Sequence, residues 1–344
     1  MDMTQLLGNR DVVAINSTEF LEPASGKGTT IQPATYADRG YNMSGGIAVI
    51  DSVQSQANRL EAIFKEEPYA RLVPQIKINE TNLLDIGHRL ADAMVNYSSG
   101  NKTVREAFDK ADKGDFTLVA KLNPTALVLG IWDSRHTRLK VPRMLGFSVD
   151  ANGVGIVRDR AAQYRASIDS ETKAMLQRDA NAGDNTSEKK TRAKMSEEGF
   201  NDIPSFDEKK GGCIAEEIIR RGVLNFIPLR GYDQALRKYL FGLALVMLTY
   251  PLDHDYRSGT LLVQDPEKPA KLEIVYRNGT REAVQMTRQQ ALDFAKDAAK
   301  EFGVGENQSF MLNDVTYKQY QKTGTTGKKA EATKRGSKKE SVEA

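Results

Sequence analysis

The sequence predicts an α+β fold built on an antiparallel sheet, and two observations lead to this prediction. Short apolar runs that suit strands are mixed with amphipathic helices, without the regular strand–helix alternation of a doubly wound parallel sheet. Towards the C-terminus, predicted strands over Leu272–Tyr276 and Thr280–Met286 flank Arg277-Asn278-Gly279, and Asn-Gly is the strongest short hairpin signal. A sheet that ends in a hairpin followed by a helix favours the α+β class.

The first strong helix signal follows a short buried strand, Ile47–Ile50. The helix begins near Asp51 or Ser52, both good N-cap residues. Its buried stripe falls at helical spacing and consists of Val53, Ala57, Leu60 and Phe64. The outward face of its first turns is rich in amides and carries Gln54, Ser55, Gln56, Asn58 and Arg59. Amides beside a helix N-terminus, which favours anions, can bind phosphates or sugars. The alternative is an ordinary solvated helix face.

A second helix is predicted over Leu83–Val95. Its polar side carries Asp85, His88 and Asp92, which can be drawn as a metal site. Arg89 lies among them, and an i,i+4 pair between Asp85 and Arg89 accounts for the acids more simply. No recognised metal-ligand spacing is present, so the sequence predicts no metal here.

The stretch Gly130–Arg143 turns abruptly from apolar to basic. Taken as a strand, residues 136–141 place His136, Arg138 and Lys140 on one face and apolar residues on the other. A row of cations two residues apart suits the backbone of a polyanion. A solvated sheet face is the alternative for this segment alone.

The remaining elements follow from similar patterns. Strands are predicted over Thr117–Leu122, Thr125–Ile131, Leu145–Val149 and Gly259–Gln264. A mostly buried helix is predicted over Tyr232–Leu248, and a capping box of Thr287 and Gln290 begins a last helix that ends at Phe302. The tripeptide Asp253-His254-Asp255 resembles an acid/base cluster, but adjacent side chains point apart, so we predict a surface loop.

Composition divides the chain into a folded body, residues 1–321, and a tail. A chain of 344 residues with 40% hydrophobic residues can build a real core, in two domains or in one with large insertions. Ser170–Gly212 holds few large apolar residues, which predicts an exposed insertion, partly disordered until something binds it. Lys322–Ala344 has seven Lys/Arg and three Glu, which predicts a disordered basic tail. Because the chain carries +3 and the tail +4, the body is left near −1, so a case for nucleic-acid binding rests on local clusters.

The sequence indicates a cytoplasmic protein. Cys213 is its single cysteine, which excludes an internal disulfide and suits a reducing compartment. The N-terminal residues show no cationic start with an apolar core, so no signal peptide is predicted. The longest apolar run, Tyr239–Tyr250, is far shorter than the roughly 20 residues that span a bilayer.

Common catalytic motifs are absent from the sequence. It has no nucleophile elbow, zinc-ligand spacing, Rossmann fingerprint or kinase motifs, and its three histidines lack the partners that catalysis requires. We therefore predict no catalytic residues and no cofactor. An RRM-like core, with four antiparallel strands and helices on one face, fits the elements, although the aromatic RNP1 motif is not present.

Several short motifs together carry a resemblance to a known family. They are DSVQSQANRLE at 51–61, HTRLKVPRM at 136–144, RSGTLLV at 257–263, DIGHR at 85–89, Gly199-Phe200 followed by Ile203-Pro204, and Gly211-Gly212. Over residues 30 to about 265, and in their order along the chain, they resemble the RAMP-superfamily backbone subunit of CRISPR type I-G (formerly I-U) Cascade effector complexes. The first motif is the most specific of the set.

This resemblance implies a modified RRM-like, ferredoxin-like antiparallel palm with inserted finger and thumb parts. It implies an oligomer in antiviral defence, whose copies line up along a guide RNA (crRNA) with other Cascade subunits. These copies hold the guide for pairing with target DNA. It implies no catalytic residue in this subunit, since cleavage is left to another protein, and no role at a membrane.

The candidate RNA contacts come from residue type and motif position. The strongest candidates for phosphates are Arg135, His136, Arg138, Lys140 and Arg143. The next are Gln54, Asn58 and Arg59, followed by Arg220, Arg221, Arg230 and Arg257. Such residues suit a protein that holds an RNA backbone without reading its sequence.

Two alternatives remain open from the sequence. One is a backbone subunit that itself cuts bound RNA through a loop aspartate, as related type III complexes do, with Asp133 or Asp253 as the candidate. The other is a general single-stranded RNA-binding or scaffold protein unrelated to CRISPR. Metal-dependent cleavage of bound RNA would identify the first alternative. Sequencing the co-purified RNA for CRISPR repeat-derived ends would distinguish the second from a CRISPR subunit.

Overall fold

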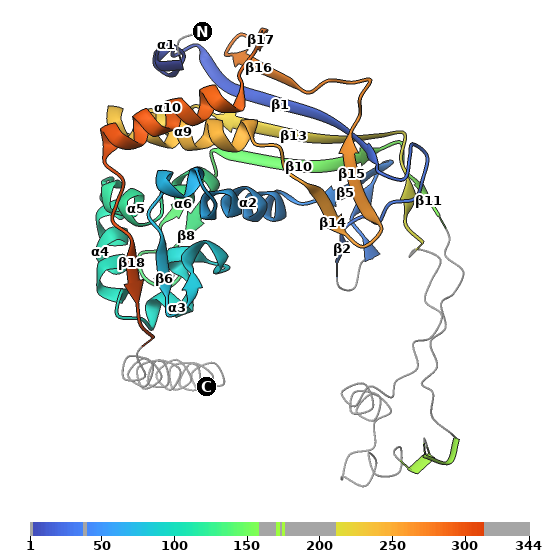
Figure 1. Cartoon of the computed structure of the whole chain (residues 1–344), viewed down its shortest axis with the longest axis horizontal. Helices are drawn as coiled ribbons and strands as arrows, with labels where there is room; N and C mark the ends of the chain where they lie inside the picture. The colour runs from blue at the N-terminus through green and yellow to red at the C-terminus, as the bar shows by residue number, and fades with distance from the viewer. Residues whose placement is uncertain (1–2, 37–39, 158–169, 173, 176–210, 313–344) are drawn as a thin grey trace, which may run out of the picture.

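The computed structural model describes residues 3–36, 40–157, 170–172, 174–175 and 211–312, and Figure 1 shows their arrangement. The insertion predicted at about 170–212 lies largely outside these residues, and the tail predicted at 322–344 lies entirely outside them. Among the helices described, none is long and apolar enough to cross a bilayer. Cys213 is a buried free thiol.

One large antiparallel sheet organises the described residues, which confirms the predicted α+β class. Its strands lie in the order β14-β15-β1-β13-β10-β5-β4, and β16 and β17 branch from β1. Their bounds are β1 Val12–Pro23, β4 Met43–Ser44, β5 Ile47–Asp51, β10 Leu145–Asn152, β13 Glu217–Asn225, β14 His254–Arg257, β15 Thr260–Gln264, β16 Lys271–Tyr276 and β17 Arg281–Val284. The strands predicted before the first helix, after the basic stretch and in the C-terminal hairpin are all present.

Strand β1 is the centre of this sheet because it pairs along both edges. One edge pairs with β13 from Ala14 to Leu21. The other edge pairs with β16 from Val12 to Thr18 and then with β15 from Leu21 to Pro23. This change of partner separates β14 and β15 from the β16-β17 hairpin. Strand β14 then meets helix α2, because Arg59 of α2 donates to a backbone carbonyl of β14.

Helices α9 (Gln234–Thr249) and α10 (Arg288–Phe302) pack against each other and share a core with β1 and β10 (Figure 1). The buried helix predicted near 232–248 and the capping box that begins α10 are both confirmed. A Cβ on Gly242 of α9 would lie 2.9 Å from the Cα of Ala295. Glycine at this position therefore allows the two helices to approach closely.

A mostly helical region lies between β5 and β10. Its elements are α2 Val53–Ala62, η1 Ile63–Lys65, η2 Tyr69–Leu72, β6 Ile76–Ile78, β7 Thr81–Asn82, η3 Leu83–Asp85, η4 Arg89–Ala91, α3 Ala93–Asn96, α4 Asn101–Asp112, α5 Thr117–Leu122 and α6 Pro124–Leu129. Strand β18 (Gln308–Phe310) returns from the C-terminal part of the chain to pair with β6 in parallel.

The strands predicted over Thr117–Leu122 and Thr125–Ile131 are wrong, because these runs form helices α5 and α6. Asn123 accepts the Ala126 N–H at 2.7 Å and caps α6, and Pro124 occupies its first turn. Short, mostly buried apolar runs do not distinguish a strand from a helix by periodicity.

The single helix predicted over Leu83–Val95 is also wrong. The segment forms two short 3₁₀ turns and the one-turn helix α3. The side chains of Asn82 and Asp92 each accept the N–H two residues on, so each one starts a new turn. Arg89 has a φ of 49°, in the left-handed region, where a continuous α-helix cannot pass.

The remaining described elements are short. They are α1 Met3–Gly8, β2 Thr35–Tyr36, β3 Gly40–Tyr41, β8 Ile131–Trp132, β9 Lys140–Val141, β11 Gly155–Ile156, β12 Cys213–Ile214 and η5 Pro228–Gly231. Strands β11 and β12 pair with each other in a separate two-stranded sheet. Residues 155–156, before the predicted insertion, therefore lie beside residues 213–214, which follow it.

Two further predictions need correction. The strand over His136–Val141 is wrong, since only its last two residues form β9, which pairs with β8 in a hairpin. The surface loop predicted at Asp253-His254-Asp255 is wrong from its second residue, because His254 begins β14 and is only 7% exposed.

Candidate nucleic-acid interface

The start of helix α2 lies where the predicted motifs meet. Ser52 caps the helix by accepting the Ser55 N–H at 3.3 Å, which confirms the predicted N-cap. Gln54 and Asn58 lie one turn apart on the exposed face, and the Gln54 amide donates to Asn58 Oδ1 at 3.1 Å. Gln54 and Asn58 of the predicted amide-rich face therefore lie at the surface. The prediction is wrong for Gln56, which is fully buried, and for Val53, which was assigned to the buried stripe and is 37% exposed.

Arg143 brings the second motif to this face. Its Nε donates to the Leu129 carbonyl at 2.7 Å, and its Nη2 donates to Gln54 Oε1 at 2.9 Å. Both acceptors are neutral, and no described acid forms an ion pair with this guanidinium. Burial, and then repulsion by Arg89, lower the pKa of Arg143. A half-buried cation without a counter-charge, beside exposed amides, is a favourable place for an anion.

Arg89 brings the DIGHR motif to the same helix. Its Nη2 donates to Asn58 Oδ1 at 2.9 Å, and its guanidinium forms a buried ion pair with Glu61. The predicted pair of Asp85 with Arg89 is therefore wrong, and Asp85 instead pairs with Lys65 at 2.6 Å. Arg89 was missed as a candidate because it was assigned to a helix that does not form. The signal in the sequence was Glu61, because an acid on the buried side of α2 requires a cation from another part of the chain as its partner.

A buried polar network supports α2 from the sheet. Gln56 donates to Asp51 Oδ2 at 2.7 Å and accepts from Arg220 Nε at 2.8 Å. Arg220 also lies 3.2 Å from Glu19, and its guanidinium stacks over the Phe147 ring at 3.9 Å. Burial lowers the pKa of Arg220, and Glu19 opposes this effect. Arg220 is only 3% exposed, so it holds Gln56 in place and does not present its charge to solvent.

Arg59 and Arg257 join α2 to β14 around Asp51. Arg59 Nη1 donates to the Asp255 carbonyl at 3.0 Å, and its Nε lies 3.6 Å from Asp51. Arg257 donates to the Gln32 carbonyl at 2.7 Å and lies 4.0 Å from Asp51. About a third of each side chain is exposed, at 30% and 31%. Both arginines therefore reach the edge of the surface formed by Gln54, Asn58 and Arg143, which we call the α2 surface.

The loop between β8 and β9 is built around Asp133. Its carboxylate accepts the backbone N–H groups of Arg135, His136 and Thr137 at 3.3, 3.2 and 2.8 Å, and the Thr137 hydroxyl at 2.8 Å. Burial raises the pKa of Asp133, but these hydrogen bonds outweigh it and hold the pKa below its usual range. The basic residues thus lie on a fixed loop, and the alternation expected of a strand is lost.

This loop presents cations to solvent. Arg135, Arg138 and Lys140 are exposed, and none of their side chains has a partner among the described residues. Arg138 has a φ of 63°, so the backbone turns sharply at this cation. His136 differs from the other three, because its Nε2 lies 2.8 Å from Asp109.

Arg221 and Arg230 do not join this surface. Successive residues of a strand point to opposite faces, so the exposed Arg221 lies on the other side of β13 from Arg220. Arg230 donates to the carbonyls of Arg10 and Val12 at 2.8 Å each, which ties η5 to the start of β1. The structure therefore groups the motif residues around α2 and leaves these two apart.

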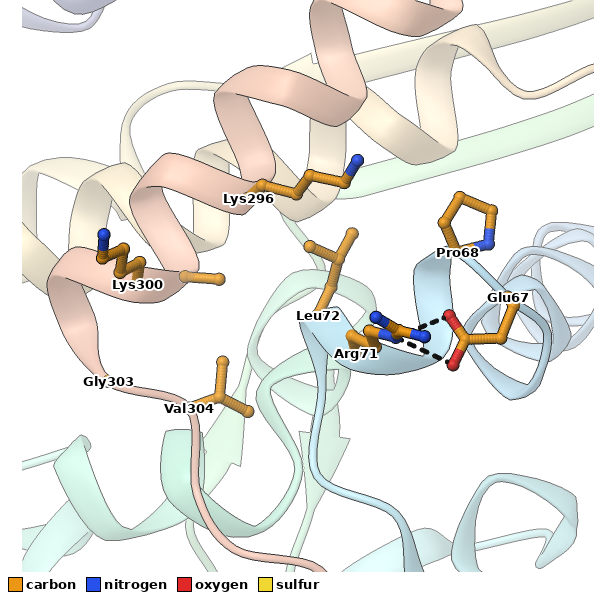
Figure 2. A pocket seen from close by; sticks show the side chains of 9 residues that line it. Glu67, Pro68, Arg71, Leu72, Lys296, Lys300, Gly303 and Val304 are labelled. Atoms are coloured by element: carbon orange, nitrogen blue, oxygen red, sulfur yellow. Dashed lines mark hydrogen bonds and ion pairs between the residues drawn. The ribbon is translucent and has the colours of Figure 1, made fainter.

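A separate hollow lies between η2 and the end of α10, and Figure 2 shows its lining side chains. Arg71 pairs with Glu67 at 3.0 Å, whereas Lys296 and Lys300 have no partner among the described residues. No predicted RNA contact lines this hollow. Within the described residues, no group of three His, Cys, Asp or Glu side chains is placed to hold a metal ion.

Comparison with known protein families bears on this interface. Residues 15–156 match the family model described as CRISPR-associated protein GSU0053. This match supports a CRISPR-associated protein. The matched region runs from β1 to β11 and contains α2, the DIGHR motif and the loop built around Asp133. No curated protein matches the chain.

Proposed function

We propose that this CRISPR-associated protein is a non-catalytic backbone subunit of a type I-G Cascade complex. It binds crRNA along the phosphate backbone, oligomerises head to tail and, with the other Cascade subunits, presents the guide for pairing with target DNA. The observation that carries the proposal is Arg143, a half-buried cation whose hydrogen-bond acceptors, the Leu129 carbonyl and Gln54, are neutral. It lies between the exposed amides of α2 and the basic β8-β9 loop.

The contacts favour recognition of backbone over recognition of bases by sequence. The guanidinium groups of Arg135 and Arg138 and the ammonium group of Lys140 suit phosphate oxygens. The side-chain amides of Gln54 and Asn58 can donate hydrogen bonds to phosphate or sugar oxygens. The body, residues 1–321, has a net charge near −1, so the electrostatic attraction for RNA has to come from this local surface. Binding of this kind tolerates any guide sequence, as a backbone subunit requires.

Reversing the charge of Arg138 and Lys140 to Glu tests RNA binding. If both contact phosphate, the salt slope of single-stranded RNA binding falls by about 1.4, and affinity falls about tenfold at 0.15 M salt, for every RNA sequence alike. The matched control reverses Lys296 and Lys300, which make the same change of charge at the hollow of Figure 2. Equal losses for the two double variants would reduce the effect to net charge and argue against an interface on the loop.

Assembly on RNA provides a second prediction. A subunit that follows a continuous RNA presents different faces to its two neighbours, and such a heterologous contact gives open arrays. The mass of RNA-bound particles should therefore increase in steps of one subunit as the RNA is lengthened, measured by mass photometry. A fixed dimer at every RNA length would favour a general RNA-binding module instead.

A further inference from the structure

Trp132 is the only tryptophan in the sequence, and it lies at the surface. Its side chain is 60% exposed in strand β8, whereas its neighbour Ile131 is only 8% exposed. Among the described residues, no aromatic ring or cation covers the indole. The largest apolar side chain of the protein is thus left in water, immediately before the loop that carries the unpaired cations.

The hairpin register fixes what lies beside the indole. Ile131 pairs with Val141, and both are buried, while Trp132 pairs with Lys140, and both are exposed. Directly opposite residues of an antiparallel pair project from the same face. The side chains of Trp132 and Lys140 therefore project as neighbours from the outer face of the hairpin.

The backbone that carries the indole is well fixed. The next residue, Asp133, donates its N–H to the Leu139 carbonyl at 2.9 Å, and its carboxylate accepts the hydrogen bonds that hold the loop. Ile131 and Val141 anchor the hairpin in the core. A ligand that stacks on Trp132 therefore does not have to order the backbone of this hairpin.

The hairpin that carries the indole also lies next to residues that contact α2. Strand β8 packs beside η4, whose Arg89 bonds to Asn58, and Arg143 follows β9 and bonds to Gln54. Exposed aromatic rings next to cations are the features that bind single-stranded nucleic acid, because every base has a face that stacks. The exposed face of the hairpin pairs this single ring with a cation, which suits a nucleic acid better than the apolar core of a protein interface.

We propose that Trp132 is a base-stacking platform for single-stranded RNA, with Lys140 and Arg138 beside it to neutralise the adjacent phosphates. This inference rests on the proposed function and adds a contact to the bases that the predicted phosphate contacts do not include. Stacking of this kind is independent of base sequence, so it is compatible with any guide.

The single tryptophan makes the test direct. The full chain is titrated with a uridine oligonucleotide and with an abasic oligonucleotide of equal length, while tryptophan emission and the anisotropy of a dye on the RNA are both recorded. We expect quenching by the uridine oligonucleotide and none by the abasic one. Trp132→Ala should weaken binding of the uridine oligonucleotide about 5- to 150-fold without a change in salt slope, and Trp132→Phe should recover most of the loss.

The outcomes separate this inference from the proposed function. RNA binding with unchanged emission, and with equal affinity for Trp132→Ala, overturns the stacking platform and leaves the proposed function intact. Absence of RNA binding by the wild type overturns both. A change in emission with protein concentration alone, together with a rise in particle mass, makes Trp132 a contact between copies and also overturns the stacking platform.

Discussion

Replacing Glu61 with Ala should destabilise the protein by about 3–5 kcal/mol, the usual cost of removing one partner of a buried ion pair. Glu61 is fully buried, forms an ion pair with Arg89 and accepts the Thr125 hydroxyl at 2.5 Å. Its loss leaves a largely buried guanidinium without a counter-charge. Chemical denaturation of the wild type and the variant measures the difference in the free energy of unfolding.

The matched control for this prediction is Asp85→Ala. Asp85 pairs with Lys65 at the surface, with side chains 48% and 34% exposed, so its removal should cost less than about 1 kcal/mol. The double variant Glu61→Leu, Arg89→Met should lose less than Glu61→Ala, because neither charge is left alone. Similar small losses for Glu61→Ala and Asp85→Ala would contradict the pairing of Glu61 with Arg89.

Local signals in the sequence account for the parts of the fold that were predicted correctly. Asn278-Gly279 gives the hairpin, Thr287 and Gln290 give the capping box, and Ser52 gives the start of α2. Each signal acts within a few residues, so it does not depend on the rest of the fold. The apolar runs that form α5 and α6 have no such local signal except Asn123-Pro124, which suits a turn as well as it suits the start of a helix.

The candidate site was predicted only in part because its contacts are not local. Arg143 reaches Gln54 and Arg89 reaches Asn58 across 89 and 31 residues of sequence. The motifs pointed to the right segments, but residue type does not say which arginine is exposed. Arg220 and Arg221 are adjacent in sequence, yet one is inside the polar network and the other is at the surface.

Replacing Asp133 with Ala separates a structural carboxylate from a catalytic one. In the folded protein this carboxylate accepts three backbone N–H groups and a hydroxyl, and its pKa is held below the usual range. We expect a loss of about 2–3 kcal/mol in stability at pH 7. RNA affinity should fall as well, because Arg135 and Arg138 are no longer held in place. Asp253→Ala, at an exposed loop position, is the control and should change neither quantity.

The pH dependence of this loss gives a check on its cause. Because the pKa of Asp133 is lowered on folding, its stabilisation is complete above the ordinary aspartate value of about 3.9 and is lost as the pH falls through the folded value. The stability difference between wild type and Asp133→Ala should therefore be constant near neutral pH and shrink in acid.

Neither protein should cleave bound RNA with Mg²⁺ or Mn²⁺, since both oxygens of the carboxylate already accept hydrogen bonds. Cleavage by the wild type that Asp133→Ala abolishes, with unchanged stability, would instead make this residue the catalytic aspartate of a type III-like subunit.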